Sequence, residues 1–264
     1  MPRAAWLIWA VGVWGLLPQG TQQPQPVAVH RVEGAIVRGP VDRRQLALVF
    51  TGHEFAEGAA TVLDALARRR ARASFFLTGL FLRNPAHTQI VERMVRDGHY
   101  VGAHSDAHLL YAPWSGPKKT LISREVFTRD LEANLRELER YGVTRTTARY
   151  FLPPYEWYNE EIAGWTAELG MTLICHTPGT RSNADYTEEN TPQFVSTDTI
   201  FRSILEKESA DPHGLNGFML LLHVGAGPGR HDKFHRKFGE LLGALSDRQY
   251  EFVRVDALLP LPSN

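Results

Sequence analysis

The chain has 264 residues, of which 43% are hydrophobic and 22% charged, and these proportions are typical of a folded globular protein. Its 29 lysines and arginines balance 29 aspartates and glutamates, so the basic excess that marks most nucleic-acid-binding proteins is missing. The single cysteine, Cys175, excludes an intrachain disulfide framework and a zinc site built from several cysteines of one chain.

The N-terminal residues have the pattern of a secretory signal peptide. Arg3 precedes an apolar run at 4–17, and a polar segment rich in proline and glutamine follows. A membrane-spanning helix needs about 20 apolar residues, so the run is too short to span a bilayer comfortably. We predict a signal peptide over 1–20, an extension over 21–44, and export to the periplasm or the extracellular space without stable membrane insertion. An uncleaved anchor is the alternative, because no clear cleavage site follows.

Short apolar segments alternate with helix-like segments from about residue 30 onward. The apolar segments are hydrophobic on both faces, as strands buried in a parallel sheet are. No glycine- or serine-rich linker and no internal repeat divides the chain, so one α/β catalytic domain over 45–260, a barrel or an open sheet, is the simplest interpretation. The seven predicted strands lie at 46–50, 73–79, 100–105, 148–154, 171–177, 217–224 and 250–255.

Some of the intervening segments carry clear helix signals. The apolar residues of 127–138 keep helical spacing, and Gly142 follows as a C-cap. Asn84 and Pro85 have the character of an N-cap and a first helical turn. The stretch 177–194 is irregular and polar, and we predict a long surface loop of the kind that often carries function.

Polar side chains follow several predicted strands at their carboxyl ends, where barrel enzymes carry their chemistry. His53 and Glu54 follow the first strand, and His223 lies near the end of the sixth. His104 and His108 follow the third strand, at a spacing that places two imidazoles on one side of a helix or tight turn, as ligands of a divalent metal. A third ligand from His53 or Glu54 would leave positions open for water and substrate, as catalytic sites do.

These residues resemble the motifs of the polysaccharide deacetylases of the NodB-homology type, carbohydrate esterases that remove N- or O-acetyl groups from sugars. Residues 104–108 match the H-[ST]-x-x-H motif, 151–159 resemble the R-P-P-Y-G motif, and 220–225 resemble the leucine-x-histidine motif. The resemblance covers about residues 45–258. It implies an irregular (β/α) barrel of about seven strands, and hydrolysis assisted by a divalent metal, usually Zn²⁺ and sometimes Co²⁺, Ni²⁺ or Mn²⁺.

The same resemblance implies roles for individual residues. His104 and His108 correspond to metal ligands, and His223 to the general acid that protonates the leaving group. The backbone N–H of Tyr155 corresponds to the donor that holds the oxyanion, and Leu221 to the apolar wall beside the acetyl methyl group.

The first motif departs from the family pattern T-F-D-D-G, in which one aspartate is the base and the next a metal ligand. Here residues 51–55 read Thr-Gly-His-Glu-Phe. In the simplest register His53 is the catalytic base and Glu54 the metal ligand, but the reverse is equally sensible because neutral imidazole binds zinc well. Leu152 stands where the family usually has an arginine paired with the base, which suggests a re-engineered base.

The substrate side of the site is less clearly marked. Trp157 has the aromatic face that stacks on sugar rings. The fourth motif, D-x-x-D-W, is not legible, and His176, Arg181 and Asp185 lie in or beside the corresponding loop, where they could replace it. The predicted substrate-binding residues are Leu221, Pro154, Trp157, His176 and Arg181.

The favoured function is therefore metal-dependent removal of acetyl groups from a carbohydrate, with a glycan containing N-acetylglucosamine as substrate. De-O-acetylation of a xylan-type polysaccharide uses the same parts and is the first alternative. A carbohydrate-binding pseudo-deacetylase without activity and a zinc amidase acting on a non-sugar substrate are the others. Retention of His104, His108 and His223 together favours an enzyme, because a binding protein does not need them.

Overall fold

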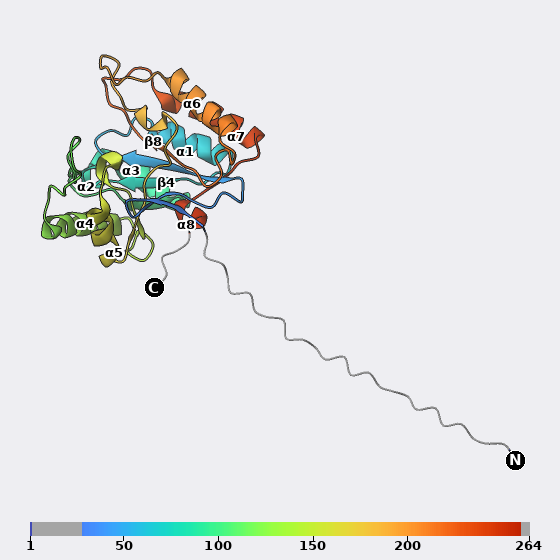
Figure 1. The fold of residues 1–264 in the computed structure, drawn as a ribbon. Coiled ribbons are helices and arrows are strands. Elements are labelled where there is room, and N and C mark those ends of the chain that lie inside the picture. The colour runs from blue at the N-terminus through green and yellow to red at the C-terminus, as the bar shows by residue number, and fades with distance from the viewer. Residues whose placement is uncertain (2–27, 260–264) are drawn as a thin grey trace.

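A curled parallel sheet lies at the centre of the computed structural model, which describes Met1 and residues 28–259 (Figure 1). The predicted signal peptide lies, apart from Met1, outside the described residues. The order of the strands across the sheet is β7 (Thr172–Leu173), β6 (Tyr150–Phe151), β5 (Tyr100–Ala103), β4 (Ser74–Leu77), β3 (Gln45–Gly52) and β8 (Met219–His223).

The seventh strand, β9 (Glu251–Val253), pairs with the beginning of β3. Ala47 of β3 lies opposite both Met219 of β8 and Val253, so β9 shares the β4 edge of β3. Every one of the seven predicted segments contains a strand, and every pairing in this sheet is parallel. The predicted α/β fold class is confirmed as a half-barrel with helices around it.

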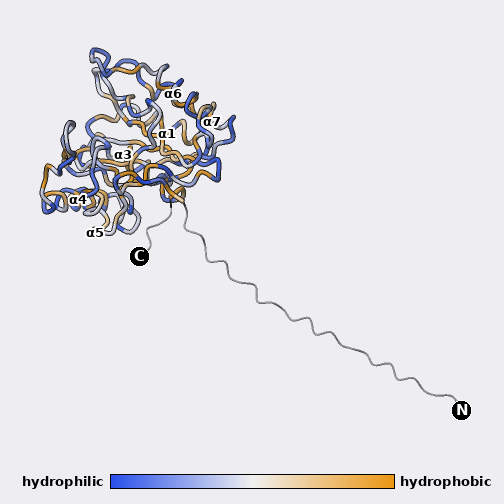
Figure 2. The backbone as a smooth tube through the Cα atoms, in the orientation of Figure 1, coloured by the Kyte–Doolittle hydropathy of each residue, from blue (hydrophilic) through white to orange (hydrophobic). Residues whose placement is uncertain are grey.

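The strands are apolar on both faces because both faces are buried. In β3, Leu48 and Phe50 pack toward the surrounding helices, whereas Ala47 and Val49 pack in the interior of the half-barrel. Figure 2 shows the same division, with hydrophobic colour along the central strands and hydrophilic colour over the outer loops. Burial on both sides removes the alternation that a half-exposed strand would show.

The structure confirms the helices and caps that the sequence predicted. Ser123 caps the helix that contains 127–138, and the positive φ of Gly142 (76°) follows its end. The Asn84 side chain accepts from the N–H of Ala86 and starts a short 3₁₀ turn that leads into the next helix. The helices are α1 (Ala59–Arg68), α2 (Gly79–Arg83), α3 (Thr88–Arg96), α4 (Arg124–Glu139), α5 (Glu160–Glu168), α6 (Thr197–Ala210), α7 (Phe238–Asp247) and α8 (Val255–Leu258).

An N-terminal hairpin joins the two ends of the curled sheet. Ile36 pairs with Ile174 just after β7, and the N–H of Gly39 donates to the carbonyl of Gly217 just before β8 (2.7 Å). The described part of the segment that we assigned to an extension therefore packs on the domain. The strands of the hairpin are β1 (His30–Val32) and β2 (Ala35–Arg38).

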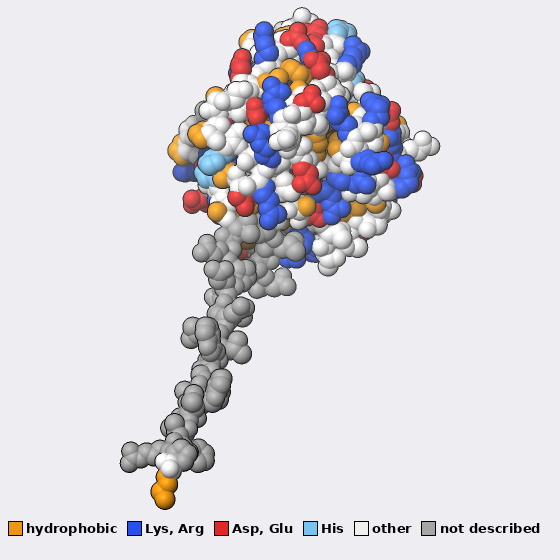
Figure 3. Space-filling model, turned by 90° about the vertical axis from the view of Figure 1, so that its right-hand side faces the viewer, with side chains coloured by type: hydrophobic (Ala, Val, Ile, Leu, Met, Phe, Trp, Pro, Cys, Tyr) orange, Lys and Arg blue, Asp and Glu red, His pale blue; other side chains and the backbone are white. Residues whose placement is uncertain are grey.

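The outer surface carries charges of both signs. On the face shown in Figure 3, acidic and basic side chains are interspersed, in keeping with the zero formal charge of the whole chain. Within the residues that the structure describes, no helix has the length and apolar character needed to cross a bilayer.

Candidate active site

A pocket of about 660 Å³ opens at the carboxyl ends of the strands. Six of the predicted site residues line it, and they come from four different strand ends: His53, Glu54, His104, His108, Tyr155 and His223. Parallel strands bring their carboxyl ends to one edge, so residues up to 170 positions apart in sequence meet there.

The orientation of His104 is fixed by the backbone around it. Its Nδ1 lies 2.7 Å from the carbonyl oxygen of Leu152, which can only accept, so Nδ1 carries the proton. Its Nε2 therefore keeps a lone pair, as a metal ligand requires. The ring is almost fully buried, and the N–H of His104 donates to the side chain of Asn134 in α4 (2.9 Å).

The loop from His104 to His108 is held by Asp130 of α4. One carboxylate oxygen accepts from the Ser105 hydroxyl (2.5 Å) and the Asp106 N–H (3.0 Å), and the other from the Ala107 N–H (2.9 Å). The N–H of His108 in turn donates to the Ser105 hydroxyl. Asp130 has no distinguishing signal in the sequence, because its burial in α4 is visible only in the structure.

Three imidazoles gather on one side of the pocket. The ring centroids of His53 and His108 are 4.4 Å apart and those of His104 and His108 5.1 Å. Burial lowers the pKa of all three, that of His108 to about 3, so all are neutral near pH 7. Glu54 is exposed where the pocket meets solvent. Within 28–259, no three His, Cys, Asp or Glu side chains already form a complete set of metal ligands.

His223 on the other side of the pocket is paired with Asp185. Its Nδ1 lies 2.6 Å from Asp185 Oδ1, and its backbone N–H donates to Oδ2 (3.0 Å). Burial disfavours the charged ring, but the Asp185 carboxylate outweighs burial and raises the pKa of His223. The pair leaves Nε2 of His223 as the atom available to transfer a proton. Asp185 was only one of three loop residues that the sequence analysis considered.

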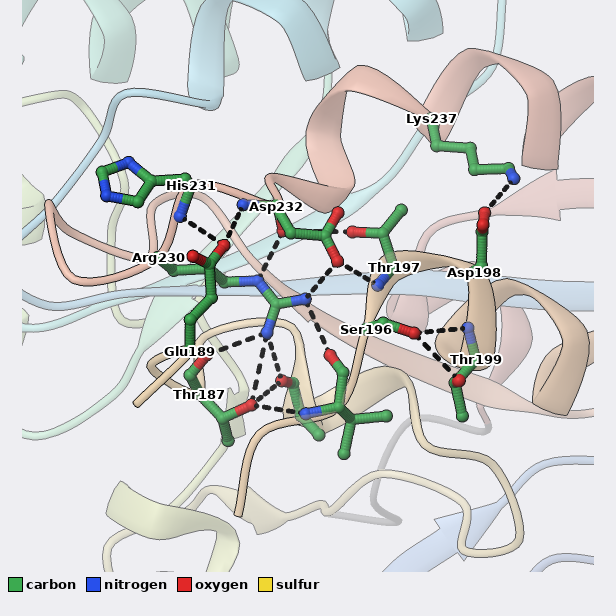
Figure 4. Close-up of polar contacts among 12 residues, drawn as sticks. Thr187, Glu189, Ser196, Thr197, Asp198, Thr199, Arg230, His231, Asp232 and Lys237 are labelled. Atoms are coloured by element: carbon green, nitrogen blue, oxygen red, sulfur yellow. Dashed lines mark hydrogen bonds and ion pairs between the residues drawn. The ribbon is translucent and has the colours of Figure 1, made fainter. Parts of the chain in front are cut away.

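A buried arginine anchors the loop that carries Asp185 (Figure 4). Arg230 is fully buried, and its guanidinium donates to four backbone carbonyls. Three of these lie in the loop or just after it, at Ala184, Thr187 and Val195. The predicted long loop is thereby fixed to the segment after β8, and Asp185 is fixed with it.

The acid that follows β3, Glu54, lines the pocket but is exposed to solvent. Thr51, one residue beyond Phe50, lines the pocket, and its buried hydroxyl has no hydrogen-bond partner among the described residues. Leu152 is fully buried in the apolar interior of the half-barrel. Leu152 is therefore a core residue, and this position brings no charge to the pocket.

The segment after β6 brings an unexpected carboxyl into the pocket. Tyr155 and Glu156 both have positive φ (58° and 52°), which is uncommon outside glycine. Glu156 lines the pocket, and burial raises its pKa to about 7. Nothing in the sequence distinguishes Glu156 from the other aspartates and glutamates, of which the chain has 29 in all.

Exposed aromatic rings surround the pocket. Trp114 and Tyr186 are 60% and 51% exposed, and Tyr155 lies edge-on to Trp114 with its centroid 5.4 Å away. Trp157 stacks behind Trp114 at 5.9 Å and donates its indole N–H to the Pro113 carbonyl.

None of the five predicted substrate-binding residues lines the pocket, because Trp157 lies behind Trp114 and the other four are buried or remote. Leu221 lies on the same face of β8 as His223 but one pleat deeper, and both Leu221 and Pro154 are buried. His176 is half-buried behind the site, and burial lowers its pKa to about 4. Arg181 is exposed, and its N–H donates to Ser203 in α6.

Comparison with known proteins decides the family. The family model described as polysaccharide deacetylase matches residues 38–174, a little over half of the chain. The chain belongs to the polysaccharide deacetylase family. The matched segment includes His53, His104, His108 and Tyr155, whereas Asp185 and His223 lie beyond it.

Two relatives from this family are peptidoglycan deacetylases. The chain is 31% identical to the peptidoglycan-N-acetylglucosamine deacetylase PgdA of Listeria monocytogenes over 50% of this chain and 25% of that protein. It is 29% identical to the peptidoglycan-N-acetylmuramic acid deacetylase PdaA of Bacillus subtilis over 43% of this chain and 39% of that protein. The chain therefore spans less than half the length of either curated relative.

Solved structures of the same family share the fold. Bacillus subtilis PdaA, a family 4 carbohydrate esterase, aligns with a TM-score of 0.66 at 21% identity, over 86% of this chain and 85% of that one. A CE4 family pseudoenzyme from Bacillus anthracis aligns with a TM-score of 0.65 at 18% identity, over 87% and 70%. The fold thus occurs in a carbohydrate esterase and in a pseudoenzyme.

Proposed function

We propose that this polysaccharide deacetylase family member is a zinc-dependent hydrolase that removes acetyl groups from a glycan containing N-acetylglucosamine. The observation that carries the proposal is the arrangement of His104 and His108 across one pocket from the His223–Asp185 pair. Neutral imidazoles with a free lone pair on one side and a proton donor on the other are what hydrolysis of an amide requires. An exported enzyme, as the N-terminal sequence predicts, would meet such a glycan outside the cell.

The pocket has donors of the kind that zinc prefers. His104 offers Nε2 because Nδ1 is bonded to Leu152, and His108 is neutral near pH 7. His53 or Glu54 is the third ligand in this proposal. Co²⁺, Ni²⁺ or Mn²⁺ could bind to the same donors in place of Zn²⁺. When bound, the metal supplies polarisation of the acetyl carbonyl and acidification of a water molecule.

The remaining steps belong to residues of this chain. His223, held protonated by Asp185, donates a proton from Nε2 to the leaving nitrogen of the sugar. The backbone N–H of Tyr155 stabilises the oxyanion.

The charge of the pocket favours an uncharged sugar. Three glutamates, Glu54, Glu156 and Glu188, line it, and no lysine or arginine occurs among the described lining residues. N-acetylmuramic acid carries a carboxylate that these groups would repel, whereas N-acetylglucosamine is neutral. Acetylated xylan is also neutral, so O-acetyl esterase activity is the alternative within the same site.

The test is metal content and acetate release from the purified full chain. We expect about one zinc per chain by mass spectrometry, and acetate release from N-acetylglucosamine oligomers in preference to acetyl-xylan and muramic acid-containing glycan. His104→Ala should lose the metal and the activity together, because its Nε2 is the buried ligand atom. Acetate release from acetyl-xylan alone would replace the favoured substrate with the O-acetyl alternative.

A second candidate function is carbohydrate binding without catalysis. It is favoured by the altered first motif, where His53 and the exposed Glu54 follow β3 in place of the two aspartates of the family pattern. A chain that binds N-acetylglucosamine oligomers, holds no metal and releases no acetate from any substrate would establish this candidate and overturn the first.

Trp114 provides a test of the sugar-binding rim. An exposed indole stacked on Trp157 offers a flat apolar face to a sugar ring. We expect Trp114→Ala to raise KM roughly three- to tenfold, the equivalent of about 0.5–1.5 kcal/mol, and to leave kcat nearly unchanged, because stacking is equal in ground and transition states. Leu80→Ala, at an exposed leucine of α2 outside the pocket, is the matched control. An unchanged KM for Trp114→Ala would remove this residue from the substrate site.

A further inference from the structure

The hydrolysis proposed above needs a base for the attacking water, and the carboxylate that follows β3, on Glu54, lines the pocket but is exposed to solvent. Thr51 points into the pocket with a hydroxyl, and Glu54 lies exposed at the pocket opening. His53 stacks on His108 and shares a hydrogen bond with Thr78, so it is grouped with the metal-binding imidazoles. A carboxyl that lines the same pocket and is less exposed than Glu54 comes from another strand end.

Glu156 is the carboxyl that another strand end supplies. It follows β6, lines the pocket and is half-buried. Among residues 28–259, no side chain donates a hydrogen bond to its carboxylate and no lysine or arginine forms an ion pair with it, although the His223 imidazole acts on it electrostatically. Burying an unpaired carboxyl costs folding free energy. A residue of this kind in a pocket is therefore a candidate for function.

The backbone at Glu156 supports the same conclusion. Its φ of 52° is a left-handed conformation, and the family motif R-P-P-Y-G has a glycine at this position. Glycine would adopt this conformation without steric cost, whereas a glutamate pays about 1–2 kcal/mol for it, by the handedness of L-residues. The backbone conformation at residue 156 therefore favours glycine, and a glutamate is present there despite the strain.

The groups that face Glu156 determine its charge. Burial raises its pKa, Asp185 acts in the same direction, and the His223 imidazole opposes them; the balance is a pKa of about 7. The neighbouring Cys175 thiol and Tyr186 phenol have pKa values raised above their usual ranges, so both are neutral. Glu156 therefore changes from acid to base over the neutral pH range, where a general base is most effective.

We propose that Glu156 is the general base of this deacetylase, an inference that rests on the proposed function. The water oxygen bonds to the acetyl carbon while its proton passes to the Glu156 carboxylate. The carbon–nitrogen bond then breaks as His223 protonates the leaving nitrogen, and the products are acetate and the sugar amine. The proton on Glu156 is afterwards lost to solvent and His223 takes one up from solvent, so the enzyme is restored and no oxidant or second reactant is needed.

The test compares Glu156→Gln and Glu156→Gly in the full chain. Both should lower kcat at least roughly 100-fold, with KM changed less than about threefold and zinc content unchanged, because a general base acts in the transition state. In the wild type, the acid limb of the kcat profile should lie near pH 7, and it should be absent from the residual activity of Glu156→Gln. Glu160→Gln, at an exposed glutamate in the first turn of α5, is the matched control.

A readout independent of turnover is the ¹³C NMR titration of the glutamate carboxyls, with Glu156 assigned by its absence from the Gln variant. A midpoint near 7 is expected, and one near 4 would overturn the inference. It would also be overturned if Glu156→Gly kept full activity, or if His53→Gln lost activity with its metal retained while Glu156→Gln stayed active. A wild-type chain that releases no acetate would instead overturn the proposed function itself.

Discussion

Replacing His223 with alanine should lower kcat by roughly 10²–10⁴-fold, the usual contribution of a general acid, while zinc content changes little. The loss is expected because the leaving nitrogen of an amide must be protonated before it departs. His223 is the pocket imidazole whose pKa is raised, through its 2.6 Å contact with Asp185. Steady-state acetate release with an N-acetylglucosamine oligomer measures the effect.

The companion variant Asp185→Asn tests the origin of this proton. The protonated form of His223 is present below its pKa, so activity should fall as the pH rises through that pKa. Without the carboxylate, burial remains and lowers the pKa of the ring, and the basic limb of the kcat profile should move to lower pH. A basic limb that stays in place would show that a group other than His223 is the acid.

Arg230→Met should lower the free energy of unfolding by about 3–5 kcal/mol, the range found when one partner of a buried polar network is removed. The substitution leaves four buried or half-buried carbonyl oxygens without their donor, at residues 184, 187, 195 and 232. Methionine nearly fills the space but cannot donate. Urea unfolding followed by circular dichroism measures the loss.

The control for Arg230 is Arg181→Met, in the same loop. Arg181 is exposed, so its substitution should change stability by less than about 0.5 kcal/mol. If Arg230→Met unfolds only the loop, the global transition will be kept, and kcat will fall because Asp185 no longer orients His223. A variant with both unaltered stability and unaltered kcat would contradict the anchoring role of Arg230.

Much of the fold follows from local patterns. A strand that is buried on both faces must be apolar on both, so the seven strands were predictable from local runs of apolar residues. The helix over 127–138 was predictable from its apolar spacing, and the turn at Asn84 from its capping residue. The β1–β2 hairpin was not predicted as part of the domain. Its pairing depends on Ile174 and Gly217, which lie about 140 and 180 residues further along the chain, and no local signal reports such partners.

The sequence by itself was enough to select three histidines that the structure brings into one pocket, because His104, His108 and His223 lie at or within a few residues of strand ends and match short motifs. Only the tertiary structure decided what supports and completes them. Asp130 and Arg230 act through hydrogen bonds to loops that are remote in sequence, and Glu156 differs from other glutamates only in its burial. Burial and long-range pairing are properties of the packed chain, so no pattern of neighbouring residues could reveal them.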